Sequence, residues 1–302
     1  RVFWYQFLMK KLQTILLTGA NGFLGSYLLE ALLSKGYKVV ILKRSTSDTW
    51  RIENLLNQCV SYDVDIQPLE LAFKEQRIDV VMHMACHYGR NDDPIHQVSE
   101  SNLIFGLRIL DACLKFNTDT FFNTDTLLQK HLNIYTLSKK QFVEWLKLTS
   151  DKIQVVNFKI EHIYGPKDDT TKFVPWVLSQ LKANVPEIKL TLGEQERDFI
   201  YIEDVVSAYI TALKKLPDLT SFNEFDVGTG KLLTVKSFLQ NLKKTYEASF
   251  GLTNTKLAFG AIPYREGEMM TVEVNNQPLL DLGWKPRTKL KCSLTSIIKE
   301  HA

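Results

Sequence analysis

A tyrosine and a lysine four residues apart are the residues of this sequence best suited to proton transfer. Tyr135 and Lys139 stand in the segment IYTLSKKQFVEW. On a helix, residues at positions i and i+4 share a face, so their side chains meet. A lysine ammonium beside a phenol favours the phenolate, which is expected to lower the pKa of the tyrosine. A tyrosine tuned in this way exchanges a proton with a carbonyl oxygen in general acid–base catalysis.

Two hydroxyl side chains stand shortly before this pair. Thr124 and Thr126 flank Asp125 at the end of the run DTFFNT, which predicts a strand over 119–124. A hydroxyl near a reacting carbonyl donates a hydrogen bond and shares the charge that develops there. Threonines at strand ends also serve as turn residues. Which of the two assists the tyrosine stays open.

A glycine-rich turn, TGANGFLG, is the second chemical feature. Its three glycines stand between an apolar run and a segment with apolar residues at helical spacing. Such a turn lets the backbone approach a pyrophosphate, and the N–H groups at the start of the helix face the phosphates. The turn therefore predicts a dinucleotide site. Its predicted cofactor-binding residues are Gly19, Asn21, Gly22, Phe23, Leu24 and Gly25.

A cationic pair stands where dinucleotide sites commonly have an acidic residue. About 20 positions past the glycines, a carboxylate usually holds the ribose hydroxyls. Here Lys43, Arg44 and Ser45 occupy that place. Cations and a hydroxyl suit a 2′-phosphate instead, so the sequence predicts NADP(H) and net reduction. A solvated cationic loop is the alternative interpretation.

The elements that position these residues alternate between strand and helix. Short apolar runs predict the strands, and apolar residues at helical spacing predict the helices between them. This alternation predicts an α/β fold: a Rossmann-type, doubly wound parallel sheet with a smaller, interleaved C-terminal substrate lobe. The predicted strands cover 13–18, 38–42, 77–85, 119–124 and 153–160, and the predicted helices cover 22–34, 98–116 and 137–148.

The rhythm of the sequence changes after HIYGP at 162–166, where prolines interrupt more irregular segments. Residues 1–8, which precede Met9, are predicted to be an upstream or non-native extension. The predicted division is a Rossmann domain of residues 9–164 and about 199–232, and a substrate lobe of residues 165–198 and 233–302.

Composition narrows the class of protein. The net charge of +3 comes from 37 basic and 34 acidic residues, a balance that argues against nucleic acid or an anionic membrane as partner. The apolar run at the beginning of the sequence is too short for a transmembrane helix. The four cysteines lack the spacing of a zinc site. They predict buried free thiols in a reducing compartment, and therefore a cytoplasmic enzyme without a metal.

The motifs together resemble the extended short-chain dehydrogenase/reductases that act on nucleotide sugars. The resemblance covers the chain from Lys11 and rests on TGANGFLG, YTLSK, HIYGP, RDFIYIEDV and DVGTG, in the family's order. It implies an NADPH-dependent reductase of the C4 ketone of a CDP-4-dehydro-3,6-dideoxyhexose. The implied product is CDP-abequose or its C4 epimer CDP-paratose, for the O-antigen of lipopolysaccharide.

The resemblance also implies roles for individual residues. Tyr135 and Lys139 match the catalytic pair, with Lys139 also holding the nicotinamide ribose. Thr124 matches the family's hydroxyl position, although Thr126 is close enough to compete. The implied cofactor contacts are Asp65 at the adenine, Ala85 and the His83 region at the nicotinamide, and Asn102 as a brace beneath it.

A CDP-sugar substrate and a possible homodimer follow from the same resemblance. The dimer would pair helices at about 98–116 and 136–148 across a two-fold axis. Two arginines suit the diphosphate of the substrate, because guanidinium groups bind phosphate bidentately. The implied substrate-binding residues are His162, Lys172, Phe173, Arg197 and Arg265.

Other functions stay open at this point. A nucleotide-sugar 4-epimerase recycles a tightly held NAD, and the pair at 43–44 argues against it only through the choice of cofactor. A 4,6-dehydratase needs a glutamate where Thr126 stands, so dehydration is disfavoured. A non-enzymatic NADP-sensing protein is the last alternative, and the presence of Tyr135 and Lys139 argues against it.

Overall fold

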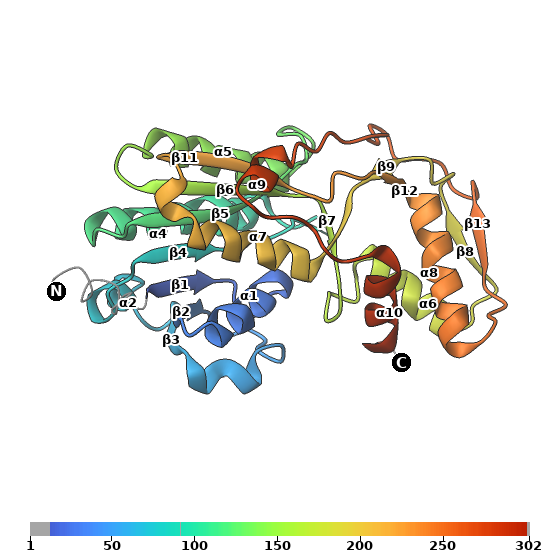
Figure 1. Ribbon diagram of the computed structural model, residues 1–302, viewed down its shortest axis with the longest axis horizontal. Helices are drawn as coiled ribbons and strands as arrows, with labels where there is room; N and C mark the ends of the chain where they lie inside the picture. The colour runs from blue at the N-terminus through green and yellow to red at the C-terminus, as the bar shows by residue number, and fades with distance from the viewer. Residues whose placement is uncertain (1–12, 91, 301–302) are drawn as a thin grey trace, which may run out of the picture. The chain divides into compact units, whose positions relative to one another are not determined.

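A seven-stranded parallel sheet organises the chain (Figure 1), and the computed structural model describes residues 13–90 and 92–300. The strand order β11-β6-β5-β4-β1-β2-β3 confirms the predicted doubly wound α/β fold. The prediction for residues 1–8 lies outside the described residues. The strands are β1 (Thr14–Thr18), β2 (Lys38–Lys43), β3 (Val60–Asp63), β4 (Val80–His83), β5 (Thr120–Thr126), β6 (Gln154–Ile160) and β11 (Phe222–Val227).

The central strands are continuous apolar runs because both of their faces are buried. All five residues of β1 are buried, and β4 is buried along its whole length. The edge strand β3, with the sequence VSYD, is less buried and was not predicted. Its alternation of polar and apolar residues spans four positions, which is too short to stand out from a loop.

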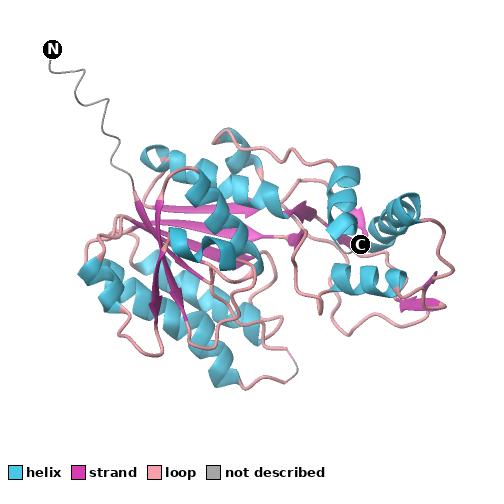
Figure 2. Ribbon diagram, turned by 90° about the horizontal axis from the view of Figure 1, so that it is seen from below, coloured by secondary structure: helices cyan, strands magenta, loops and turns pink. Residues whose placement is uncertain are grey.

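Helices connect the strands, as Figure 2 shows in cyan against the magenta sheet. The single helix predicted over 98–116 is a continuous helical run that contains a π-helical turn, η2. The helical elements between β1 and β6 are α1 (Phe23–Ser34), η1 (Glu53–Gln58), α2 (Glu70–Glu75), α3 (Ile95–Ser99), η2 (Glu100–Ile104), α4 (Phe105–Lys115) and α5 (Ile134–Leu148).

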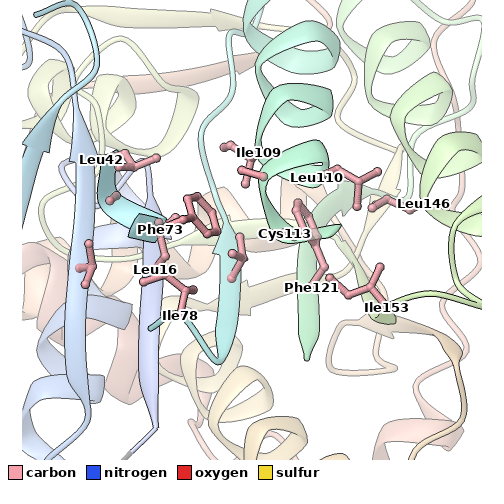
Figure 3. Close-up of a cluster of buried hydrophobic side chains, with 14 of the residues drawn as sticks. Leu16, Leu42, Phe73, Ile78, Ile109, Leu110, Cys113, Phe121, Leu146 and Ile153 are labelled. Carbon is pink, nitrogen blue, oxygen red and sulfur yellow. The ribbon is translucent and has the colours of Figure 1, made fainter. Parts of the chain in front are cut away.

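One face of the sheet packs against α2, α4 and α5 through a single hydrophobic cluster (Figure 3). Leu16 and Phe121 point from the strands, and Phe73, Ile109 and Leu146 meet them from the helices. Burying one such side chain contributes roughly 1.5–3 kcal/mol. This core holds the carboxyl ends of β4 and β5 and the start of α5 in fixed relation, which is what the candidate site requires.

The chain divides into two compact units. Unit 1 contains the described residues up to Phe158 together with Pro217–Glu224, and unit 2 contains Lys159–Leu216 and the described residues from Phe225. The boundaries fall inside β6 and β11. The functional division into a Rossmann domain and a substrate lobe stays a prediction.

Unit 2 is built from small elements around one buried aromatic group. The rings of Phe199 and Phe238 stack with centroids 3.8 Å apart, and Tyr164 packs edge-on against both. Its elements are β7 (His162–Tyr164), α6 (Phe173–Lys182), β8 (Glu187–Leu190), β9 (Glu196–Arg197), β10 (Phe199–Tyr201), α7 (Ile202–Lys214), β12 (Leu233–Thr234), α8 (Val235–Phe250), β13 (Lys256–Phe259), α9 (Gln277–Asp281) and α10 (Leu290–Glu300), and η3 (Leu216–Asp218) crosses the boundary.

The cysteines are free, but the prediction that they are buried is wrong for three of the four. Cys113 is buried in the core, Cys59 is half-buried, and Cys86 and Cys292 are exposed. Cys86 lies three residues after the end of β4. Separately, none of the helices within 13–90 and 92–300 combines the length and the apolarity that crossing a membrane requires.

Candidate active site

The glycine turn after β1 leaves no room for a side chain at two of its positions. A Cβ on Gly19, whose φ is +65°, would lie 2.7 Å from the backbone nitrogen of Ala85. A Cβ on Gly25 would lie 2.0 Å from the carbonyl oxygen of Gly19. The Gly22 N–H donates to the same carbonyl at 3.0 Å, which closes the turn. The close packing of backbone predicted from the glycine spacing is therefore present.

The helix that follows the turn has the features of a phosphate site. Gly22 is the N-cap of α1, and no side chain caps the helix there. The first-turn N–H groups and the positive end of the helix dipole favour an anion at this point. Phe23 is buried and Leu24 half-buried on the first turn, so both hold the helix in place by packing. These residues fit a dinucleotide pyrophosphate.

The cationic stretch at the end of β2 is engaged by carboxylates. The Lys43 ammonium lies 3.6 Å from Asp63, its partner in register on β3. Ser45 donates its hydroxyl to Asp63 at 2.8 Å and its backbone N–H to Asp65 at 3.0 Å. Desolvation works against the ionised form of Asp63, but the bonds from Ser45 and Asp65 and the charge of Lys43 outweigh it and lower its pKa.

The remaining groups at this end are more exposed. Arg44 is exposed, and its backbone N–H donates to the hydroxyl of Ser47. Asn21, within the glycine turn, donates to the carbonyl of Asp48 and accepts at its own carbonyl from the Arg51 guanidinium. Arg51 therefore adds a third cation near the turn, one that the spacing of the glycine motif did not indicate.

A buried threonine and histidine organise the end of β4. Thr18 accepts hydrogen bonds from the backbone N–H groups of Met84 and Ala85, each at 3.2 Å. Its hydroxyl proton is then directed to Nδ1 of His83, at 2.9 Å, which makes that nitrogen an acceptor. Burial, together with the charge of Lys139, lowers the pKa of His83 to about 3. His83 is therefore a neutral structural residue.

The loop after β4 is tied to the catalytic helix through Asn102. The Asn102 side chain accepts from the His87 N–H at 2.7 Å and donates to the His87 carbonyl at 2.8 Å. It also donates to the hydroxyl of Ser138 on α5 at 3.0 Å. Asn102 lies in the π-helical turn η2, where the wider turn brings its side chain inward. The brace expected at this residue thus has a bonding pattern to support it.

Tyr135 and Lys139 lie one turn apart at the start of α5. Asn133 caps the helix. Its side-chain oxygen accepts from the Thr136 N–H, and the Thr136 hydroxyl accepts from the Asn133 N–H. This capping box fixes where the helix begins and so fixes the first-turn position of Tyr135. Lys139 is 1% exposed. The Tyr135 ring packs against Tyr88, with centroids 5.2 Å apart.

The expected lowering of the tyrosine pKa is wrong for the protein as it stands. Burial raises the pKa of Tyr135 well above its ordinary value, and charge on Cys86 and Asp125 raises it further. Burial lowers the pKa of Lys139, as does the charge of Lys140, whereas Cys86 and Asp125 act to raise it. Spacing on a helix predicts that two side chains share a face, but it does not predict the desolvation or the ionisable groups contributed by β5 and by the loop after β4.

The two threonines at the carboxyl end of β5 have different surroundings. Thr124 places its hydroxyl 2.9 Å from the sulfur of Met84 at the end of β4. Thr126 accepts at its hydroxyl from the Leu128 N–H, so it serves as a turn residue. Asp125, between them, is buried and paired with Lys140 at 2.7 Å. Thr124 is therefore the better candidate for a hydroxyl that assists catalysis.

The five predicted substrate residues all lie in unit 2, whereas the catalytic and cofactor candidates all lie in unit 1. His162, at the start of β7, is exposed and bonds through Nδ1 to the buried carboxylate of Glu161 at 2.8 Å. The Lys172 ammonium lies 2.9 Å from Asp168. Next to it, Phe173 stacks on Trp176 in a solvent-exposed aromatic pair.

The two arginines of unit 2 differ in environment. Arg197 is buried and donates to Glu268 at 2.6 Å and to the carbonyl of Glu196 at 2.7 Å. Arg265 is exposed and begins the turn that carries Glu268, whose N–H donates to the Arg265 carbonyl. One arginine is thus held in place by a carboxylate, and the other presents its guanidinium to solvent.

Several residues of these surroundings were not identified from the sequence. Asp63 and Glu161 each stand at or just after the carboxyl end of a strand, within two residues of a residue that was identified, and Tyr88 stands in the loop after β4, three residues past Ala85. Their position relative to the strand ends is a signal that the sequence contains. Glu268 lies 71 residues from Arg197, and nothing local to either residue indicates the pair.

Comparison with known proteins places this site in a family. Residues 15–228 match the family described as NAD dependent epimerase/dehydratase. The chain belongs to this family of extended short-chain dehydrogenase/reductases. It is 32% identical, over 94% of its length, to a CDP-abequose synthase of Salmonella typhimurium, 97% of which is covered.

Solved structures of the epimerase/dehydratase family share the fold. A UDP-glucose 4-epimerase of Thermotoga maritima, determined with UDP-glucose, has a TM-score of 0.82 at 21% identity, covering 95% of this chain and 98% of that one. A UDP-glucose 4-epimerase of Thermus thermophilus in complex with NAD has a TM-score of 0.81 at 22% identity, covering 96% and 99%. The family supports a nicotinamide dinucleotide as cofactor and a nucleotide sugar as substrate.

Proposed function

We propose that the protein reduces the C4 ketone of a CDP-4-dehydro-3,6-dideoxyhexose with NADPH and forms CDP-abequose or its C4 epimer CDP-paratose. The supporting observation is the Tyr135–Lys139 pair, held at the carboxyl ends of β4 and β5, in a chain similar over nearly its full length to a CDP-abequose synthase. The product alcohol would enter O-antigen synthesis, in the cytoplasm.

The glycine turn between β1 and α1 is the proposed cofactor site. The turn of Gly19, Gly22 and Gly25 would receive the pyrophosphate at the start of α1, and Ala85 would line the nicotinamide side. NADPH, when bound, supplies the hydride that reduces C4. Lys139 would hold the nicotinamide ribose from α5.

Side chains of the protein supply the proton that the reduction requires. Tyr135 donates its phenolic proton to the C4 oxygen as that oxygen gains negative charge, and Thr124 donates a hydrogen bond to the same oxygen. Hydride at C4 and a proton at oxygen together convert the ketone to an alcohol. The buried Lys139 stabilises the phenolate that remains on Tyr135.

The substrate residues of unit 2 suit a nucleoside diphosphate. The exposed Phe173–Trp176 pair offers a flat apolar surface to a pyrimidine base, and Arg265 offers a solvent-exposed guanidinium to a phosphate. Arg197 would bind the diphosphate only by sharing or releasing Glu268. His162 and Lys172 add polar groups that their neighbouring carboxylates hold in position.

One observation favours a second candidate, an NAD-dependent nucleotide-sugar 4-epimerase. The carboxylates of Asp63 and Asp65 both bond to Ser45, where they would repel a 2′-phosphate and suit free ribose hydroxyls. Against this stand the cations Lys43, Arg44 and Arg51 at the same end of the turn. NADP(H) remains the proposed cofactor. Its preference over NAD(H) should be smaller than three cations alone would give.

A homodimer is part of the proposal. α5 leaves Trp145 and Leu148 exposed at 47% and 72%, and Ile104 beside α4 is exposed at 37%. Apolar residues exposed together on neighbouring helices are typical of a subunit interface. Light scattering during gel filtration measures the mass directly, and a mass near 34.8 kDa would contradict the dimer.

The direct test of the activity supplies both proposed reactants. The protein is incubated with CDP-4-dehydro-3,6-dideoxyglucose and NADPH, loss of nicotinamide absorbance is followed, and the product sugar is identified by NMR. We expect stoichiometric oxidation of NADPH and a single C4 alcohol. The Tyr135→Phe protein is the control. Interconversion of UDP-sugar C4 epimers without net NADPH loss would favour the epimerase instead.

A further inference from the structure

A buried carboxylate on β5, the strand that precedes the helix of the proton donor, has no task in the proposed reaction. Asp125 stands near the end of β5 with its side chain 1% exposed. Its Oδ2 accepts from Lys140 at 2.7 Å and lies 3.5 Å from the amide of Asn157. Its Oδ1 has no hydrogen-bond partner among the residues that the structure describes. Burying a carboxylate is costly unless a cation compensates it.

The compensating cation is the residue next to the catalytic lysine. Lys140 follows Lys139 on α5, and successive residues of a helix point about 100° apart. The Lys140 ammonium therefore turns back toward β5, where it donates to the Asp125 carboxylate and to the carbonyl of Thr126. Lys139 and Lys140 are thus two adjacent cations with different neighbours.

We propose that Lys140 is a positioning residue that holds Asp125 and offsets part of the negative charge that this carboxylate presents to Tyr135. With the ion pair intact, the Lys140 ammonium offsets the carboxylate charge, and Lys139 lies one turn from Tyr135 on the same helix. Without Lys140, a full negative charge would oppose the phenolate that forms when Tyr135 gives up its proton. The inference rests on the proposed function in one respect, the assignment of Tyr135 as proton donor.

The ionisable groups that act on Tyr135 or share its helix come from three parts of the described chain. Cys86 lies after β4, Asp125 lies on β5, and Lys139 and Lys140 share α5 with the tyrosine. Cys86 and Asp125 both act to raise the pKa of Tyr135. Lys140 therefore acts on the phenol through the carboxylate that it holds.

A purely structural role for the Lys140–Asp125 ion pair predicts a different pattern of effects in the variants. An ion pair that only ties α5 to β5 would lower stability when either partner is removed, and both losses would have the same sign. A charge effect on Tyr135 has opposite signs for the two partners. Removing Lys140 leaves an uncompensated anion near Tyr135, whereas replacing Asp125 by asparagine leaves an uncompensated cation.

The test follows the ionisation of Tyr135 in four variants: Lys140→Met, Asp125→Asn, the double variant and Lys140→Arg. Tyrosines are labelled with carbon-13 at Cζ in the full chain with bound NADP⁺, and the Tyr135 resonance is identified by its loss in Tyr135→Phe. Lys130→Met is the matched control, because Lys130 pairs with Glu144 of α5 at the exposed surface. The alkaline limb of the reductase pH profile gives a second readout.

Lys140→Met should raise the titration midpoint of Tyr135 by on the order of one pH unit, and Asp125→Asn should lower it by a similar amount. The double variant, Lys140→Arg and Lys130→Met should stay within a few tenths of a unit of the parent protein. Shifts of the same sign in both single variants, or no shift in either, would overturn the inference. If Lys140→Met does not fold, the downward shift in Asp125→Asn decides.

The two proposals fail separately. If the protein does not reduce the CDP-sugar but the two single variants shift the Tyr135 midpoint in opposite directions, the proposed substrate is wrong and the role of Lys140 is supported. If the protein reduces the CDP-sugar but neither single variant shifts the alkaline limb, the proposed substrate is supported and the role of Lys140 is wrong.

Discussion

The two ends of the candidate cofactor site are built in different ways. At the catalytic end, Thr18, His83 and Asn102 are buried, and each bonds to backbone or side chains that come from other elements. At the ribose end, Arg44 and Ser45 are exposed on a loop among carboxylates. Burial restricts which residues fit, so the catalytic end is defined by packing, whereas the ribose end is defined by a balance of surface charges.

The difference suggests how each end should respond to change. A substitution at the catalytic end removes a specific group from a fixed, desolvated arrangement, where its effect is large. A substitution at the ribose end changes one of several partly screened charges, where effects are smaller.

The largest effect is expected at Tyr135. Tyr135→Phe removes the proton donor and keeps the ring, which continues to pack against Tyr88. General acid catalysis of this kind is worth about 10²–10⁴ in rate. Steady-state turnover should fall by that factor, while NADPH affinity, measured by fluorescence, should stay near that of the parent protein.

The same substitution at Tyr88 is the matched control. Tyr88→Phe also removes one hydroxyl from this pair of packed rings, and we expect turnover to stay within a few-fold. Comparable losses from both substitutions would mean that the two tyrosines act as one unit and that Tyr135 is not the sole donor.

A second large effect is expected from the glycine turn. Gly25→Ala would place a Cβ 2.0 Å from the Gly19 carbonyl oxygen, so the turn must open. Overpacking of this kind typically costs about 1–3 kcal/mol, and we expect NADPH affinity to fall roughly 10- to 100-fold. Titration calorimetry with each cofactor measures the loss.

Gly22→Ala provides the comparison within the same turn. Its Cβ would lie 3.2 Å from the same oxygen, and Gly22 does not have a positive φ. A smaller loss of affinity is expected. Equal losses would show that the turn responds to any side chain, and not to the close approach at Gly25.

Much of this architecture was predictable from the sequence, for reasons that differ by residue. The glycines, the end of β2 and the start of α5 follow from local spacing and from apolar runs. The ion pairs Lys140–Asp125 and Lys43–Asp63 join neighbouring elements, and they depend on strand register and helix phase that no single segment contains. The raised pKa of Tyr135 was not predictable for the same reason, because it comes from burial and from groups on β5 and in the loop after β4.

A moderate effect is expected from the buried histidine at the catalytic end. The unfolded chain takes up a proton at His83 below pH about 6.5, whereas the folded protein keeps it neutral down to about 3. The unfolded state therefore binds more protons in this window, and stability falls as the pH decreases. Between pH 6.5 and pH 5 we expect a loss of about 2 kcal/mol from this residue.

Urea unfolding at several pH values measures this contribution. His83→Gln should lose less stability toward pH 5 than the parent protein. The slope of unfolding free energy against pH should differ between them by the equivalent of about one bound proton. His96→Gln, at an exposed position on α3, is the control for a histidine substitution outside the site. Parallel pH profiles for the parent and His83→Gln would show that the histidine does not contribute.

The smallest effect is expected at the ribose end, where the double substitution Lys43→Ala with Arg44→Asp should reverse the cofactor preference. The parent protein should bind NADPH about 10-fold more tightly than NADH, toward the lower limit for charge-assisted phosphate contacts. The preference is modest because Asp63 already engages Lys43 and Ser45. In the variant, the new carboxylate should repel the 2′-phosphate and accept hydrogen bonds from the ribose hydroxyls of NADH.

A third variant, Asp63→Asn, sharpens this prediction because it frees Lys43 without adding a cation. If the carboxylate limits the preference, Asp63→Asn should favour NADPH further, by a few-fold, and rising salt should reduce that gain as exposed charges are screened. Dissociation constants for both cofactors at two ionic strengths measure all three proteins. Suppose that the parent protein binds NADPH and NADH equally and that Asp63→Asn leaves both affinities unchanged. That result would mean that the cations form only a solvated loop. The site would then suit NAD, and the epimerase would become the better proposal.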